Sequence, residues 1–201
     1  MRSRIPWRIV ILALWAAGPG RADAHLVNSG FGPFYDGVAH LFVTPEDLLV
    51  VVALALVAGL RGRPFGRAVL WVLPLAWLAG ILAGRVAAFP AALPWLSAAL
   101  LVTLGGLVAA DRKSPLAVIA GAALLCGLAQ GAFNGAALAG VGAGALAALG
   151  IGGAVFVVVA LIAGQVSTLG EAWGRIAVRV AGSWIAAIGL LMLGWAMRGG
   201  S

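Results

Sequence analysis

Long runs of apolar residues, separated by short polar connections, dominate the chain. From residue 45 onwards, six such runs lie close to the twenty residues that a helix needs to cross a bilayer. They cover residues 45–60, 67–84, 91–110, 115–133, 141–164 and 176–197. None shows the alternation of apolar and polar residues that is typical of a membrane barrel. The pattern predicts an all-α polytopic membrane protein, with a bundle of six transmembrane helices over residues 45–198.

Composition supports this class and excludes two others. Hydrophobic residues make up 63% of the chain and charged residues only 9%, whereas a soluble domain is about 25% charged. The net charge of +7 could suggest nucleic acid as a partner, but the chain has no basic patch interleaved with aromatic residues. The lipid bilayer is therefore the predicted environment, and we expect no nucleic-acid partner.

The N-terminus has the features of a secretory signal. Arg2, Arg4 and Arg8 precede the short apolar run IVILALWAAG, and small residues follow in Ala22-Asp23-Ala24. This order predicts a signal peptide over residues 1–24 with cleavage after Ala24. The mature chain would then begin at His25; the alternative is an uncleaved signal anchor.

The positions of the basic residues predict the orientation. Placing the mature N-terminus outside leaves only Arg85 and Arg198 on that side. The cytoplasmic side then receives Arg61, Arg63, Arg67, Arg112, Lys113, Arg175 and Arg179. We therefore expect a protein of the bacterial inner (cytoplasmic) membrane with a periplasmic N-terminal segment, residues 25–44.

The start of the first apolar run resembles a helix start. Thr44 is a suitable N-cap, and Pro45 fits the first helical position, where no backbone N–H is needed. Glu46 and Asp47 then lie in the first turn, where the helix dipole favours acidic residues. Thr44 with Asp47 resembles a capping box. On this interpretation the residues before Thr44 form a short periplasmic loop.

The same stretch is a candidate metal site. If the chain folds back at Thr44, the imidazole of His40 can meet the carboxylates of Glu46 and Asp47. That donor set suits a divalent transition metal such as nickel, cobalt, zinc or manganese. Asp36 could add a ligand, and a mature N-terminal His25 would offer both its amine and its imidazole, a pair that suits copper or nickel.

Two motifs resemble the HupE/UreJ family, whose members are regarded as nickel or cobalt permeases or as accessory membrane proteins of hydrogenase and urease maturation. The family's first-helix motif is a histidine, five residues, then Asp-His. The matching positions here are His40, Glu46 and Asp47, so an acid replaces the second histidine. The stretch GLAQGAFNG, residues 127–135, is similar to the family's glycine-flanked histidine motif, with Gln130 or Asn134 in place of the histidine.

Two polar residues of that middle run form a second candidate. Gln130 and Asn134 are four residues apart and share one helix face, and the adjacent Gly131 and Gly135 allow a partner helix to approach closely. The two amides either hold helices together by hydrogen bonds or line a transport path. Gln165, in a segment that resembles a later family motif, is a third polar candidate.

These observations leave two functions open. The first is a permease that captures a divalent cation at its periplasmic mouth, with nickel or cobalt implied by the resemblance and copper or zinc possible from the ligands. The second is a non-transporting accessory protein that serves a partner in metalloenzyme maturation; the lack of charged residues between 116 and 170 favours it. We expect no enzyme and no organic cofactor, because no catalytic or nucleotide-binding motif is present.

Overall fold

The computed structural model describes residues 29–87, 93–170 and 172–198, and over these residues it is entirely helical and contains no strand. The helices are α2 (Pro33–Val43), α3 (Pro45–Arg61), α4 (Arg63–Val86), α5 (Pro94–Ala110), α6 (Leu116–Gly140), α7 (Ala145–Ser167) and α8 (Ala172–Arg198). The predicted all-α class is confirmed. The signal peptide and His25 lie outside the described residues.

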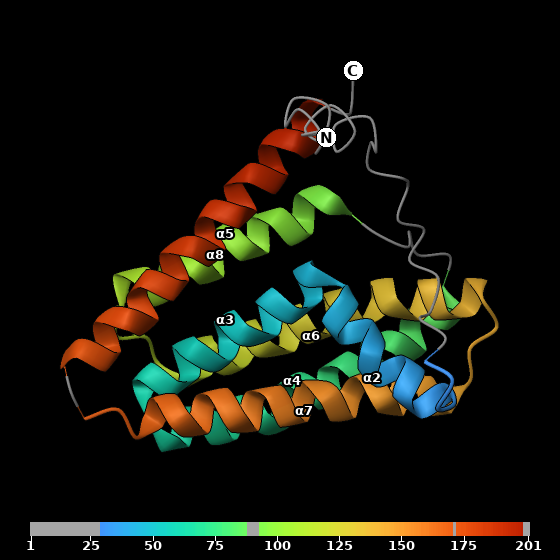
Figure 1. Cartoon of the computed structure of the whole chain (residues 1–201), viewed down its shortest axis with the longest axis horizontal. Coiled ribbons are helices and arrows are strands. Elements are labelled where there is room, and N and C mark those ends of the chain that lie inside the picture. The colour runs from blue at the N-terminus through green and yellow to red at the C-terminus, as the bar shows by residue number, and fades with distance from the viewer. Residues whose placement is uncertain (1–28, 88–92, 171, 199–201) are drawn as a thin grey trace, which may run out of the picture.

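Helix α3 joins the two parts of the molecule. On one side α4, α6 and α7 run beside it and α2 packs on α7; on the other, α5 and α8 form a pair that spreads away from α4, α6 and α7 (Figure 1). Most of α3 is buried, including the run from Ala53 to Leu60. An apolar helix buried on nearly all sides is expected at the centre of a bundle.

Judged by length and hydropathy, fewer of the described helices can cross a bilayer than the six predicted. Among the described residues, four helices are long and apolar enough to cross a membrane: α4, α6, α7 and α8. Helices α2 and α3 pass the same test only together, with a bend of 78° between them, which makes a fifth candidate. Helix α5 has only 17 residues. The positions of the helices α3 to α8 agree with the six apolar runs. Helix α5, however, is too short to cross a bilayer by this test.

The segment predicted to be a periplasmic loop contains the helix α2. Pro33 occupies the first turn of α2, and Gly37, His40 and Leu41 form its buried face. Thr44 both ends α2 and precedes α3; its N–H donates to the His40 carbonyl, and its side chain makes no capping hydrogen bond. The capping-box prediction is therefore wrong, although Pro45 and the first-turn acids lie where the sequence predicts.

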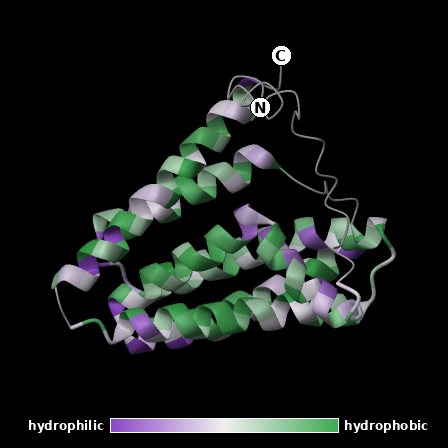
Figure 2. Cartoon of the chain, viewed as in Figure 1, coloured by the Kyte–Doolittle hydropathy of each residue, from purple (hydrophilic) through white to green (hydrophobic). Residues whose placement is uncertain are grey.

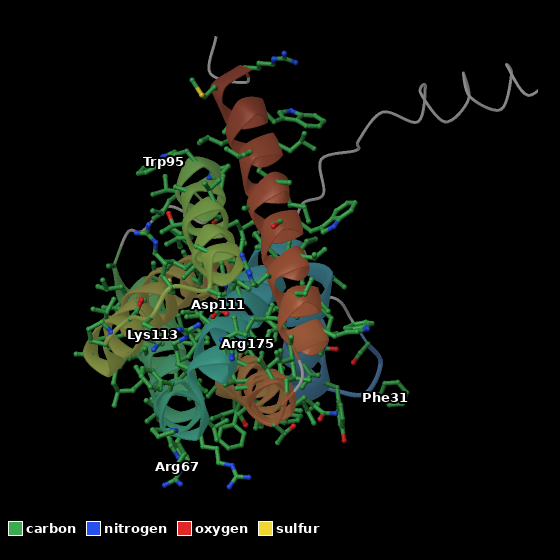
Figure 3. The ribbon with its side chains drawn as sticks, turned by 90° about the vertical axis from the view of Figure 1, so that its left-hand side faces the viewer. Phe31, Arg67, Trp95, Asp111, Lys113 and Arg175 are labelled. Atoms are coloured by element: carbon green, nitrogen blue, oxygen red, sulfur yellow. The ribbon has the colours of Figure 1, made fainter. Side chains whose placement is uncertain are left out.

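The basic residues are segregated as the sequence predicts. The seven basic residues predicted to be cytoplasmic lie where α3, α5 and α7 end and where α4, α6 and α8 begin. Arg85 and Arg198 lie at the opposite ends, in the last turns of α4 and α8. Hydrophilic residues gather towards the helix ends (Figure 2). Figure 3 views the basic end, where Asp111 forms ion pairs with Arg61 and with Arg175, the latter at 2.7 Å. Which end faces the cytoplasm stays a prediction.

Glycines bring α4 and α6 into backbone contact. A Cβ at Gly131 would collide with the backbone of Trp77, and one at Gly135 with that of Ile81. Gly80 and Gly84 of α4 meet the α6 backbone in the same way. The predicted close packing of small residues is confirmed. It fixes the rotation of α6 about its own axis, so that the helix face next to these glycines, which carries Gln130 and Asn134, points towards α3.

We predict that Gly131→Ala destabilises the bundle. The added methyl group must displace the Trp77 backbone, and overpacking of this kind costs about 1–3 kcal/mol. Gly121→Ala is the matched control on the same helix, since nothing lies within 4 Å of a Cβ there. Thermal unfolding in detergent should show a lower melting temperature for Gly131→Ala only. Equal melting temperatures would contradict the close approach of the two helices.

Candidate functional site

A buried carboxylate lies at the bend between α2 and α3. Asp47, in the first turn of α3, is only 3% exposed. Isolated carboxylates are costly in an apolar interior unless other groups satisfy them. The partners of Asp47 therefore determine what this part of the molecule can do.

Two amides from α6 satisfy the carboxylate. Gln130 Nε2 donates to Asp47 Oδ1 at 2.9 Å, and Asn134 Nδ2 donates to Asp47 Oδ2 at 2.7 Å. Asn134 Nδ2 also donates to the Gln130 carbonyl at 2.8 Å. Both amide side chains are buried, at 1% and 4% exposure. Their spacing of four residues places them one above the other on α6, so that each reaches one oxygen of the same carboxylate.

Two further side chains extend this group. Ser97 of α5, also buried, donates a long hydrogen bond of 3.4 Å to Gln130 Oε1. His40 of α2, 5% exposed, lies beside Asn134. We call the set of His40, Asp47, Ser97, Gln130 and Asn134 the Asp47 cluster. Four helices contribute to it, and Ser97 is the member that sequence reasoning missed, since a single serine in an apolar run gave no distinct signal.

The other candidate residues lie outside the cluster. Glu46 is next to Asp47 but only partly buried. Asp36 accepts hydrogen bonds from the backbone N–H and the hydroxyl of Ser29, at 2.7 and 2.6 Å. Gln165 is exposed near the end of α7, towards the basic end of the molecule.

The conformation does not assemble a site from acidic, histidine and cysteine ligands alone. In the part of the chain that the structure describes, no three such side chains gather closely enough to hold a metal ion. His40, Glu46 and Asp47 are therefore not a formed three-ligand site here. The partners of Asp47 are the side-chain amides of Gln130 and Asn134, whose neutral oxygen atoms are metal ligands of a different kind.

Asp47 has no basic partner among the described residues and has acceptor capacity left. Within the described residues, no lysine or arginine forms an ion pair with Asp47, in contrast to Asp111, which pairs with Arg61 and Arg175. A carboxylate offers about four lone-pair positions, and two hydrogen bonds use only half of them. The buried Asn134 Oδ1 has no hydrogen-bond partner. A buried acceptor without a partner calls for an explanation, and a bound ion is one that fits its position beside Asp47.

Comparison with known proteins agrees with the resemblance seen in the two motifs. The model of the family described as HupE / UreJ protein matches residues 12–192. The chain belongs to the HupE/UreJ family. This family of membrane proteins is generally linked to nickel and cobalt transport or to accessory roles. No curated protein and no solved structure matches the chain.

The structure explains how the two HupE/UreJ-like motifs relate to each other. In the resemblance, Asp47 corresponds to the second histidine of the first motif, and either Gln130 or Asn134 to the histidine of the second. These two side chains form a direct hydrogen bond between α3 and α6. The segments that carry the two motifs therefore meet in one place.

Proposed function

We propose that this HupE/UreJ membrane protein is a permease for a divalent transition-metal cation, with Asp47 as the carboxylate that holds the cation inside the bundle. The observation that carries the proposal is the burial of Asp47 without a basic partner among the described residues. Ionisable groups inside membrane bundles mark ion paths far more often than chance placement would give. The lack of charged residues between 116 and 170 does not weaken the proposal, because α3 supplies the carboxylate to α6.

The amides provide a way to exchange hydrogen bonds for metal ligands. Rotation of the Asn134 or Gln130 side-chain amide would present its oxygen where its NH₂ group now lies. The cation would then be bound by Asp47 and by amide oxygens, with water or His40 in further positions. Without the cation, the same amides return to donating to the carboxylate. The cluster is thus stable both with and without its substrate.

The donor set bears on which metals the site accepts. Carboxylates, carbonyl oxygens and water suit Mn²⁺ and other hard cations, whereas imidazole suits nickel, copper and zinc. With one imidazole among five polar side chains, the Asp47 cluster favours nickel less than a histidine-rich site would. We propose Mn²⁺ and Co²⁺ as substrates beside Ni²⁺.

The outer part of the path would begin at the bend. Glu46, partly exposed beside Asp47, and His40 would receive the cation from the periplasm, with Asp36 and His25 as additional ligands near the entrance. An inside-negative membrane potential would drive uptake, since two charges crossing 100 mV gain about 4.6 kcal/mol. Nucleotide hydrolysis is not needed for this step.

The proposal is tested with the full chain reconstituted into liposomes. We expect influx of Mn²⁺, Co²⁺ and Ni²⁺, measured with an enclosed metal-sensitive dye, to exceed that of protein-free liposomes and to increase with an inside-negative potential. If the protein does not increase the uptake of any of the three metals above that of protein-free liposomes, the permease function is contradicted.

The second candidate function is a non-transporting accessory protein for metalloenzyme maturation. It is favoured by the mutual satisfaction of Asp47, Gln130 and Asn134, which is also how polar residues hold membrane helices together. This function predicts a stable protein partner in the host membrane and no metal flux in liposomes. The same reconstitution therefore separates the two functions.

A further inference from the structure

A pocket of about 330 Å³ lies between the beginning of α4 and the end of α7, at the basic end of the molecule. Its polar lining includes Arg63 and Arg67, and Leu70, Val159 and Ala163 contribute to its apolar lining. We infer that this pocket binds one anionic phospholipid, with the phosphate at the two arginines and the upper acyl chains on the apolar wall. The inference is independent of the proposed transport, because the pocket and the Asp47 cluster share no residue.

Within residues 29–87, 93–170 and 172–198, no acidic group neutralises the charge of the pocket. Arg63 and Arg67 are one turn apart on α4, and no acidic residue that the structure describes lines the pocket. Neither arginine forms an ion pair with a described residue, in contrast to Arg61 and Arg175, which both pair with Asp111. Both are exposed, so their guanidinium groups can reach a headgroup. Two arginines in reach of one phosphate can form charge-assisted, bidentate hydrogen bonds.

The ends of the two helices also favour an anion. Helix α4 begins at Arg63, and its positive dipole end adds to the two arginine charges. The end of α7 carries the opposite dipole, but the hydroxyls of Ser167 and Thr168 donate to the Gly164 and Gln165 carbonyls at 2.8 Å each. These bonds partly satisfy the carbonyl groups that would otherwise repel a phosphate.

The apolar part of the pocket selects a lipid over a soluble anion. Gly66 and Gly164 leave its wall without side chains at two places, and a Cβ at Gly164 would meet nothing within 4 Å. Leu161 and Val157 continue along α7 as exposed apolar residues. A free phosphate would leave this surface uncovered, whereas acyl chains would cover it. A basic mouth above an apolar groove at a helix end is the pattern of an anionic headgroup site.

Native mass spectrometry of the full chain in detergent, with added phosphatidylglycerol or phosphatidylcholine, tests the inference. We expect phosphatidylglycerol to bind more tightly, and the double variant Arg63→Gln/Arg67→Gln to weaken its binding about 25-fold, since each basic residue near an anionic lipid contributes roughly a factor of five. Arg112→Gln/Lys113→Gln is the control, because these two exposed residues share the basic end but do not line the pocket.

A second variant tests the groove without changing charge. Gly164→Leu fills the open wall and should weaken phosphatidylglycerol binding while leaving both arginines in place. Equal binding of the two lipids, an equal loss in the control double variant, or unaltered binding to Gly164→Leu would each overturn the inference. Displacement of the bound lipid by millimolar inorganic phosphate would also overturn it, because the site would then be one for a free anion.

Discussion

Asp47→Asn is expected to lower the initial rate of metal influx into liposomes at least 100-fold. Asparagine has nearly the same volume as aspartate, so the packing of α3 against α6 is kept. The substitution removes the carboxylate that would bind the cation, and a hundredfold loss corresponds to about 2.8 kcal/mol, which is modest for the loss of a charged ligand from a buried cation site. The measurement is dye-reported influx at equal amounts of reconstituted protein.

Glu46→Gln is the matched control for this prediction. It removes one carboxylate from the same helical turn, but Glu46 is only partly buried and is not hydrogen-bonded to the α6 amides. We expect a smaller loss, confined to low metal concentrations, because Glu46 would act in capture only. Wild-type influx in Asp47→Asn, or an equal loss in both variants, would show that Asp47 has no special role.

Asn134→His is expected to increase the preference for Ni²⁺ over Mn²⁺ about tenfold. The substitution places an imidazole beside Asp47 and His40, and imidazole nitrogen suits nickel better than amide oxygen does. A tenfold change corresponds to about 1.4 kcal/mol of relative binding free energy. The ratio is measured by competition of the two metals for influx in one preparation.

The control for added histidine is Gln165→His. Gln165 is an exposed residue near the end of α7, outside the Asp47 cluster, and a histidine there should leave the ratio unchanged. If Asn134→His folds and transports but shows the ratio of the wild type, residue 134 does not contact the metal.

Much of the fold could be predicted from local sequence patterns. The apolar runs predict the helices α3 to α8 because hydropathy is a property of single segments, although α5, and α3 without α2, fall short of spanning length. The glycines at 131 and 135 predict close packing for the same reason, since a helix face is defined by spacing. The rotation of α6 that they produce places Gln130 and Asn134 on a neighbouring face, and this could be expected from the sequence as well.

The helix that meets the Gln130 and Asn134 face of α6 could not be predicted. Asp47 is 83 residues from Gln130 and 87 from Asn134, and no local pattern specifies which helix α6 meets. The sequence around Asp47 is instead fully compatible with a helix start, so its acids needed no further explanation. The resemblance to two family motifs was the only sign that the segments belong together.

Helix α2 was missed for a different reason. Its eleven residues are too few for a span and contain Tyr35, Asp36 and His40 among the apolar ones. The helix is held by packing of Gly37 and Leu41 on the bundle, where a Cβ at Gly37 would collide with the Ala147 backbone. Tertiary packing of this kind stabilises short helices that would be marginal alone. The consequence is that His40 is placed by a helix, and not by a loop, against Asn134.

The central claim is that a divalent cation binds at Asp47, between α3 and α6. The most direct measurement is a structure of the full chain with Co²⁺, in which anomalous scattering locates the metal. The account predicts one ion bound to Asp47, with the side-chain oxygen of Asn134 or Gln130 turned towards it. An ion found only elsewhere, with Asp47 still hydrogen-bonded to both amides, would contradict it.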